Sequence, residues 1–459
     1  MKQSDRKTEP YVSTTNACKL CKPLGACLAF RGLEGAVPFL HGSQGCATYM
    51  RRYIISHFRE PMDIASSSLG EKHAIYGGGP NLKMGLKNVM SKYEPKLIGV
   101  ATTCLTETIG DDVPMNVNEF RREFSDVMEA HGSPAIVAVS TPSYAGSHME
   151  GFHAAVKAAV AGLAEETASH DGIALFPGFI SPADTRYVME VFQDFGLNLT
   201  IMPDLSITLD APALEYYENL PSGGTPLRDI KSLPGSRAVL EFGRTIAKGQ
   251  TAAALLNERF GVPAYRLGVP VGLRETDLFF EVLEELSGNR MPEKHSLERG
   301  RLIDAYVDGH KYVFGKRAVV YGDEDLVTGL TAFLSEIGVR PVLCASGGRS
   351  GQFAESVRQV TDGLLPEPPA VREGVDFHTI AEEADALQPD LIIGNSKGYH
   401  LAKKWNIPLI RVGFPIHDRF GGQRILHLGY RGAQGLLDNI VNTLIEAKQE
   451  NSPIGYSYI

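Results

Sequence analysis

KLIGVATT, residues 96–103, is apolar along almost its whole length and runs directly into Cys104. A strand covered on both faces shows such a continuous run, whereas a strand with one face in water alternates apolar and polar residues. Similar short runs with helix-length segments between them occur at residues 135–140, 172–176, 198–202, 237–242, 317–321, 340–344, 390–394 and 408–412. This repetition of strand and helix predicts parallel sheets joined by right-handed crossovers.

Amphipathic helices are expected between these strands. EGFHAAVKAAVAGLAEE, residues 150–166, places its apolar side chains on one stripe. Residues 250–260 and 432–448 show the same pattern. The predicted fold class is therefore α/β, with helices covering both faces of each sheet.

The length of the chain indicates several domains. Its 459 residues exceed the about 250–300 residues that one hydrophobic core can organise. Polar joints near residue 168 and at residues 288–301 divide the chain. We therefore predict three Rossmann-like, doubly wound domains with mostly parallel sheets, spanning residues 1–170, 171–300 and 301–459.

The composition excludes several classes of protein. The chain is 43% hydrophobic and 22% charged, with a formal charge of −9. A nucleic-acid binder would normally present a basic face. No apolar run reaches the about 18 residues of a membrane-spanning helix, and residues 1–19 lack the apolar stretch of a signal peptide. We expect a cytoplasmic protein that binds neither nucleic acid nor membrane.

Six cysteines are the residues with the clearest chemistry, and in a cytosolic protein their thiols stay reduced. They are Cys18, Cys21, Cys27, Cys46, Cys104 and Cys344. One reading is that they are small buried apolar side chains. The Cys18–Cys21 pair lacks the second pair of ligands that a structural zinc site needs.

Three of the polar positions follow strands or strand-like runs of the first predicted sheet. Cys46 lies in the glycine-flanked HGSQGC after an apolar run, Cys104 ends KLIGVATT, and Ser143 follows residues 135–140. Ligands bind beyond the carboxyl ends of parallel strands, so we expect these side chains at one edge of that sheet. Cys21, Cys46 and Cys104 fit no compact ferredoxin spacing. They fit an iron–sulfur cluster that is held by separate loops and completed by a partner chain.

Other motifs have simpler explanations. The glycine-rich residues 75–80 and 346–351 could cradle phosphate, but neither is a dinucleotide or Walker loop. Asp304 and Asp308 share a predicted helix with His310, which fits a solvated helix face. His57 could carry a proton, although a hydrogen-bonded structural histidine is the more common case.

The motifs together resemble the nitrogenase component 1 superfamily. They are CKPLGA at 21–26, HGSQGC at 41–46, HFREP at 57–61, YGGGPNLKMGL at 76–86, TTCLTETIGDD at 102–112, TPSYAGSHMEGF at 141–152, IMPDLS at 201–206, LIIGNSK at 391–397, RVGFP at 411–415 and GYRG at 429–432. Within the superfamily, residues 51–68 and 81–89 look most like the N subunit of the scaffold that assembles the iron–molybdenum cofactor. The alternative is the β subunit of the catalytic molybdenum–iron protein.

The resemblance implies a function and its partners. It implies an α₂β₂-type heterotetramer with a homologous E-type subunit, in which the cofactor precursor matures in the partner chain. A dinitrogenase reductase (iron protein) would dock on the complex. The scaffold chain would have no turnover of its own, whereas the alternative is a subunit of an oxidoreductase.

The resemblance also implies metal ligands. Cys21, Cys46 and Cys104 match cysteines that hold one side of an eight-iron cluster in the catalytic protein, and Ser143 matches a serine that can also bind it. In the scaffold, a [4Fe-4S] cluster occupies this place with the cysteine matching Cys46 as ligand. Some N-type subunits keep only that cysteine, but here all three positions are cysteine. No role is implied for Cys18, Cys27 or Cys344.

Overall fold

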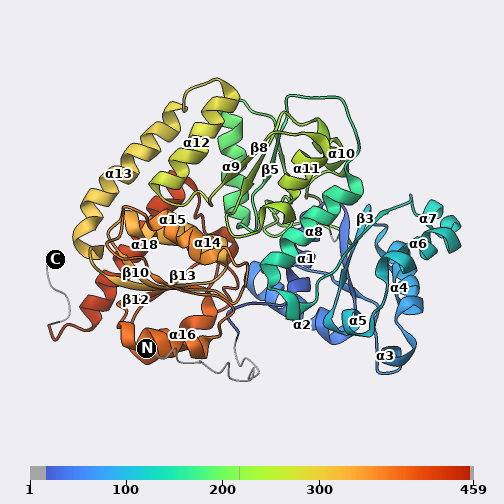
Figure 1. Ribbon diagram of the computed structural model, residues 1–459, viewed down its shortest axis with the longest axis horizontal. Coiled ribbons are helices and arrows are strands. Elements are labelled where there is room, and N and C mark those ends of the chain that lie inside the picture. The colour runs from blue at the N-terminus through green and yellow to red at the C-terminus, as the bar shows by residue number, and fades with distance from the viewer. Residues whose placement is uncertain (1–16, 217, 455–459) are drawn as a thin grey trace, which may run out of the picture.

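Three parallel sheets form the protein (Figure 1). The computed structural model describes residues 17–216 and 218–454, so most of the N-terminal stretch expected to lack a signal peptide lies outside the described residues. Hydrogen-bonded neighbours run parallel in each sheet. The predicted α/β fold with parallel sheets is confirmed. In the described residues, no helix has the length and apolar character needed to span a membrane.

The strand orders are those of doubly wound sheets, because the chain starts inside each sheet and adds strands toward both edges. The first sheet is β2 (Ala65–Ser66), β1 (Ala36–His41), β3 (Leu97–Thr102) and β4 (Ala135–Val139). The second is β6 (Leu199–Ile201), β5 (Ile173–Phe176), β7 (Ala238–Phe242) and β8 (Ala264–Leu267). The third is β11 (Ala370–Arg372), β10 (Arg340–Ala345), β9 (Arg317–Tyr321), β12 (Leu391–Gly394) and β13 (Leu409–Arg411).

Helices separate the strands. Around the first sheet they are α1 (Lys22–Arg31), α2 (Gln44–Phe58), α3 (His73–Tyr76), α4 (Gly79–Tyr93), α5 (Cys104–Ile109), α6 (Val113–Glu123), α7 (Ser125–Ala130) and α8 (His148–Leu163). Along the second part of the chain they are α9 (Pro182–Asp194), α10 (Leu227–Ser232), α11 (Ala252–Phe260), α12 (Leu273–Ser287) and α13 (Glu293–Val313). The last are α14 (Glu324–Glu336), α15 (Phe353–Thr361), α16 (Phe377–Leu387), α17 (Tyr399–Trp405) and α18 (Gly429–Glu450).

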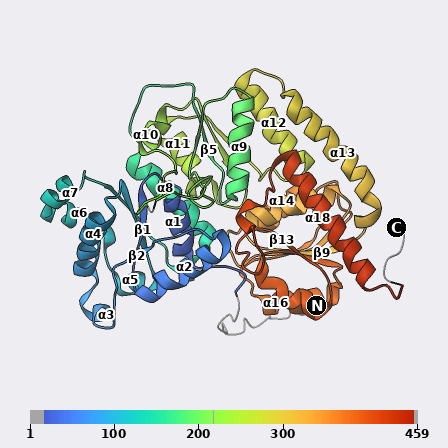
Figure 2. The same ribbon diagram turned by 180° about the vertical axis from the view of Figure 1, so that it is seen from behind.

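The passage expected to be a polar joint, residues 288–301, is largely helical. Helix α13 begins at Glu293, and α18, the last helix of the described chain, packs along it (Figure 2). The passage reads as polar because most of the α13 surface faces solvent, while residues such as His295 and Leu302 are buried. We propose domain boundaries near residues 170 and 300, which fall between the strands of successive sheets.

Helices α1 and α8 pack closely over the first sheet (Figure 1). A Cβ atom on Gly25 would lie 1.6 Å from the carbonyl oxygen of His148, and one on Gly151 would lie 1.9 Å from that of Lys22. Only glycine allows the two backbones to approach this closely. Because Lys22 follows Cys21, this contact also positions the first thiol of the predicted site.

The chain segment before α1 crosses to the third sheet. Cys18 donates its backbone N–H to the carbonyl oxygen of Val375 at 3.3 Å and accepts one from Gly347 at 3.1 Å. The ammonium group of Lys397 donates to the carbonyl oxygen of Lys19 at 3.3 Å. The residues just ahead of Cys21 are therefore fixed to the third sheet, while α1 is fixed to the first.

Candidate metal centre

Four predicted side chains lie at one edge of the first sheet. Cys46 is in the first turn of α2, after β1, and Cys104 is the first residue of α5, after β3. Ser143 follows β4, and Cys21 precedes α1. Cys46, Cys104 and Ser143 lie at the same edge because parallel strands end on the same side of a sheet. Cys21 comes from a separate segment and is brought to this edge by the packing of α1 on α8.

Direct contacts join these residues. The backbone N–H of Ser143 donates to Sγ of Cys104 at 3.3 Å, and its hydroxyl oxygen accepts the N–H of Lys22 at 3.2 Å. The Ser143 hydroxyl also hydrogen-bonds the Cys21 thiol, whose pKa responds to the charges of Cys46 and Cys104. All three thiols are free, Cys104 being exposed and Cys21 and Cys46 partly buried. Ser143 thus contacts both Cys104 and the segment that carries Cys21.

The pKa of Cys21 shows that bringing the thiols together disfavours their ionised forms. Burial raises the pKa of Cys21 above its ordinary value, and the neighbouring Cys104 and Cys46 raise it further, whereas Ser143 and Lys19 lower it. Neighbouring thiolates repel one another, and bound metal cations would remove that repulsion. Three converging soft thiols are the donor set that iron–sulfur clusters take. Within residues 17–216 and 218–454, no three His, Cys, Asp or Glu side chains are grouped closely enough to hold a single metal ion.

Buried hydrogen bonds hold the loops that carry Cys46 and Cys104. The hydroxyls of Thr103 and Thr106 both donate to the carbonyl oxygen of His41 at 3.0 Å. The His41 ring in turn contacts Ser67 at 2.9 Å and Asp111 at 3.1 Å. The two strand ends therefore form one rigid unit, with the thiols on its outer side.

The protein's own carboxylates occupy the two glycine-rich loops. Gly78 donates its N–H to both carboxylate oxygens of Asp111 at 3.0 Å. At the start of α15, Gly351 and Phe353 donate theirs to Glu373 at 3.3 and 3.2 Å. These N–H groups, which a phosphate would need, already have anionic partners.

The remaining cysteines lie inside the protein. Cys18, Cys27 and Cys344 are buried, and burial raises the pKa of each, to about 12 for Cys18 and Cys344. Cys344 also contacts the Thr331 hydroxyl at 3.2 Å. These thiols are small core side chains.

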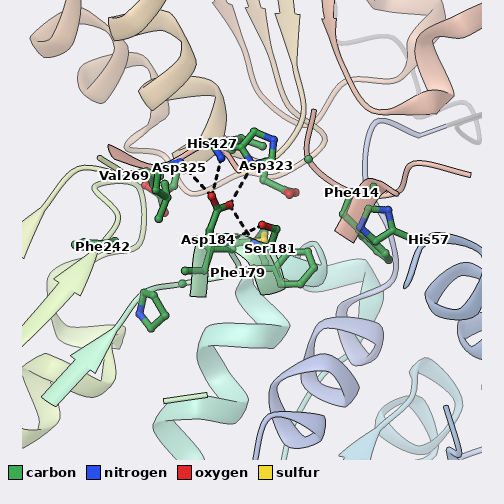
Figure 3. Close-up of a pocket in the computed structure, with 18 of the residues that line it drawn as sticks. His57, Phe179, Ser181, Asp184, Phe242, Val269, Asp323, Asp325, Phe414 and His427 are labelled. Atoms are coloured by element: carbon green, nitrogen blue, oxygen red, sulfur yellow. Dashed lines mark hydrogen bonds and ion pairs between the residues drawn. The ribbon is translucent and has the colours of Figure 1, made fainter. Parts of the chain in front are cut away.

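The other singled-out groups also have structural surroundings. His57 is buried, and its Nδ1 accepts the backbone N–H of Ile416 at 2.9 Å. Asp304 and Asp308 lie on the exposed side of α13. Sequence reasoning missed a cavity where loops from all three sheets meet, lined by His57, His153 and His427 among others (Figure 3). Its residues His57 and Phe414 lie in the quoted motifs HFREP and RVGFP, but the walls come from segments far apart in the chain, so no single motif reveals the cavity.

Comparison with known proteins identifies the family. The model of the family "Nitrogenase component 1 type Oxidoreductase" matches residues 21–445. The chain belongs to this family. The resemblance seen in the motifs is therefore confirmed, and the match begins at Cys21, the first of the three clustered thiols.

Relatives within the family are similar over nearly their whole length. The molybdenum–iron protein beta chain of Clostridium pasteurianum is 34% identical over 432 residues, which cover 94% of this chain and 93% of that one. The vanadium–iron protein beta chain of Trichormus variabilis is 33% identical, with 92% of each chain covered. These names correspond to the catalytic alternative rather than to the scaffold N subunit.

Solved structures agree with the family assignment. A chain of "Nitrogenase Cp1 at pH 6.5" superimposes with a TM-score of 0.92 at 33% identity and covers 99% of this chain and 98% of that one. A chain of "Nitrogenase Cp1 at pH 5" shares the fold at a TM-score of 0.71 and 15% identity. The whole described fold is therefore that of this family.

Proposed function

We propose that this chain is the β-type subunit of a nitrogenase component 1 complex, holding one side of an iron–sulfur cluster at the boundary with a homologous α-type subunit. The observation that carries the proposal is that Cys21, Cys46 and Cys104 lie at one sheet edge, where Ser143 contacts Cys104 and the segment of Cys21. Thiolates from three segments with N–H and hydroxyl donors beside them suit a cluster of several irons. The proposal includes the cytoplasm as its location, because thiols stay reduced there.

The surface beside the thiols supports a shared site. Cys104 is exposed, and Tyr144, next to Ser143, is 67% exposed. Helix α3, which contacts α5, exposes 79% of Ile75 and 83% of Tyr76. Large apolar side chains exposed around open metal ligands indicate a protein interface. The α-type partner would cover them and supply the remaining ligands of the cluster, in an α₂β₂-type heterotetramer.

Each residue of the site has a distinct part in this proposal. The three thiols bind iron, and the N–H of Ser143 stabilises negative charge on Sγ of Cys104. The Ser143 hydroxyl, which receives the Lys22 N–H, offers an oxygen ligand nearby. When bound, the cluster supplies one-electron transfer, and hydrogen bonds to its sulfur ligands adjust its potential.

This function could belong to a catalytic nitrogenase or to a scaffold for cofactor assembly, and we propose the catalytic nitrogenase in preference. The relatives that support it are 33–36% identical and named as beta chains of molybdenum–iron or vanadium–iron nitrogenase. The chain would then hold half of an eight-iron relay cluster in an oxidoreductase served by a dinitrogenase reductase.

The second form is the scaffold for iron–molybdenum cofactor assembly. It is favoured by residues 51–68 and 81–89, which resemble the N-type subunit. These segments form the end of α2, strand β2 and most of α4, beside the thiol edge. In this form the partner is an E-type subunit that carries the cofactor precursor. The cluster is then a [4Fe-4S] centre on Cys46, and this chain has no turnover of its own.

One experiment separates the two forms. The complex of this chain with its native partner is purified without air and supplied with reductase, MgATP and acetylene. Sustained ethylene formation without added nitrogenase supports the catalytic form. Activation of cofactor-free nitrogenase by a complex that reduces no acetylene supports the scaffold. A complex without iron and acid-labile sulfide would contradict both.

A further inference from the structure

The cavity missed by sequence reasoning lies where the three sheets meet (Figure 3). Its volume is about 50 Å³, and it opens partly to solvent. The walls come from the end of α2, from α8, from the last residue of β7, and from the segments that follow β5, β8, β9 and β13. Crevices beyond the carboxyl ends of strands are the usual ligand sites of such folds.

Asp184 and His427 form a buried pair on one wall (Figure 3). The Nδ1 atom of His427 lies 3.0 Å from Oδ2 of Asp184, and the backbone N–H groups of His427 and Leu428 donate to Oδ1 at 2.7 and 3.0 Å. Burial alone would raise the pKa of Asp184, but His427 and these hydrogen bonds hold it below its ordinary value. The carboxylate is therefore ionised and acts as an acceptor.

This geometry fixes the proton of His427. Because ionised Asp184 only accepts, Nδ1 of His427 carries a hydrogen, and Nε2 is the ring nitrogen left to meet a ligand. Nε2 is buried and has no hydrogen-bond partner, and the whole residue is 5% exposed. Buried polar atoms are rarely left unpaired.

Two more imidazoles line the cavity. His153 is 8% exposed, its Nε2 also lacks a partner, and burial lowers its pKa, so the ring is neutral. A Cβ on Gly178 would lie 3.9 Å from that Nε2, so glycine leaves room in front of it. His57 accepts a backbone N–H at Nδ1, which places its own hydrogen on Nε2.

The other walls are aromatic or acidic. Phe414 lies between Phe179 and His57, with edge-to-face ring contacts of 5.5 and 5.0 Å. Asp323 and Asp325 also line the cavity. Of the described residues that form its walls, none is Lys or Arg. The cavity therefore repels anions and offers flat apolar faces together with hydrogen-bond acceptors.

We infer that this cavity binds a small planar molecule that donates N–H groups, neutral or cationic and of the size of imidazole, with Nε2 of His427 as its acceptor. The site is independent of the thiol edge and does not depend on the proposed function. The aromatic rings of Phe179 and Phe414 would pack on the ligand, and the lone pair of His427 would select N–H donors over purely apolar molecules.

Crystals of the complex soaked in 4-bromoimidazole test the position of the ligand. The inference expects an anomalous bromine peak inside the cavity, within contact of the rings of Phe179 and Phe414. Calorimetry at pH 8, where imidazole is neutral, should detect imidazole binding and neither acetate nor benzene binding of comparable strength. His427→Leu should weaken imidazole binding at least tenfold. Val269→Phe, which fills the cavity from another wall, should abolish it.

Two controls keep the test decisive. His378→Leu, which changes a surface histidine, should bind imidazole as the unmodified protein does. An unchanged circular-dichroism spectrum and an unchanged Tm in each variant show that its fold is kept. A bromine peak only outside the cavity would overturn the inference. So would unchanged imidazole affinity in His427→Leu, or equal binding of benzene.

Discussion

The backbone N–H of Ser143 donates a hydrogen bond to Sγ of Cys104 across 3.3 Å. This contact joins the loop after β4 to the thiol after β3, so two neighbouring strand ends act together at the site. The same serine receives the N–H of Lys22 on its hydroxyl oxygen and so also touches the segment of Cys21. Ser143 therefore links the segments that carry two of the three thiols of the candidate metal centre.

Removing single thiols should remove iron. Cys46→Ala and Cys104→Ala are each expected to lower the iron and acid-labile sulfide of the purified complex by the content of one interface cluster, since each deletes a ligand. Cys344→Ala removes a buried thiol that contacts the Thr331 hydroxyl and should leave the iron content unchanged. Full iron content in both ligand variants would show that the ligands are assigned wrongly.

Gly151→Ala should destabilise the protein and disturb the site together. The new Cβ would lie 1.9 Å from the carbonyl oxygen of Lys22, so α1 has to move away from α8. Overpacking of this kind costs about 3 kcal/mol, and the movement displaces Cys21. The expected result is a lower Tm with reduced iron content. Gly435→Ala in the exposed part of α18 meets no atom within 4 Å and should raise stability by about 1 kcal/mol.

His57 should make the protein sensitive to acid. Burial lowers the pKa of His57 from 6.5 to about 3. Between these values the unfolded chain binds the proton more readily, so the stability due to neutral His57 is complete above about pH 6.5 and is lost as the pH falls. The loss is at most about 5 kcal/mol. His57→Asn keeps an acceptor for Ile416 and should flatten the fall in Tm between pH 6.5 and 4. An unchanged slope would contradict this account.

Glu324 should make the protein less stable as the pH rises, which is the opposite of the effect of His57. Burial raises its pKa from 4.5 to about 8, and its Oε2 has no partner. The unfolded chain releases this proton at lower pH than the folded protein does, so stability is lost as the pH rises from 4.5 through 8. Glu324→Gln should therefore gain Tm relative to the unmodified protein, and the gain should be larger at pH 8 than at pH 5. A gain independent of pH would refute the assigned protonation.

Most strands could be predicted from sequence, including the edge strands β4, β6 and β13, whereas other edge strands could not. KLIGVATT at 96–103 corresponds to β3, and the run at 317–321 coincides with β9. These strands are covered on both faces, so their sequences are apolar throughout. The edge strands β8 and β11 were missed, because residues such as Ala264 and Arg372 are exposed and interrupt the apolar run.

The candidate site, too, could be predicted from the sequence only in part. Cys46, Cys104 and Ser143 each follow a strand, so their common edge could be expected from topology alone. The position of Cys21 depends on Gly25 and Gly151 at the contact between α1 and α8, which is more than a hundred residues apart in sequence. The cavity around His427 depends on long-range contacts of the same kind, and no local pattern records them.

Because residues 18 and 19 are attached to the third sheet and α1 packs on the first, the position of the Cys21 sulfur depends on both sheets. Any rotation of the third sheet against the first would pull on the chain directly ahead of Cys21, while Cys46 and Cys104 stay with their own strands. The distances between the three sulfur atoms would therefore change with the orientation of the third sheet relative to the first. A cluster bound to all three sulfur atoms would restrain that orientation.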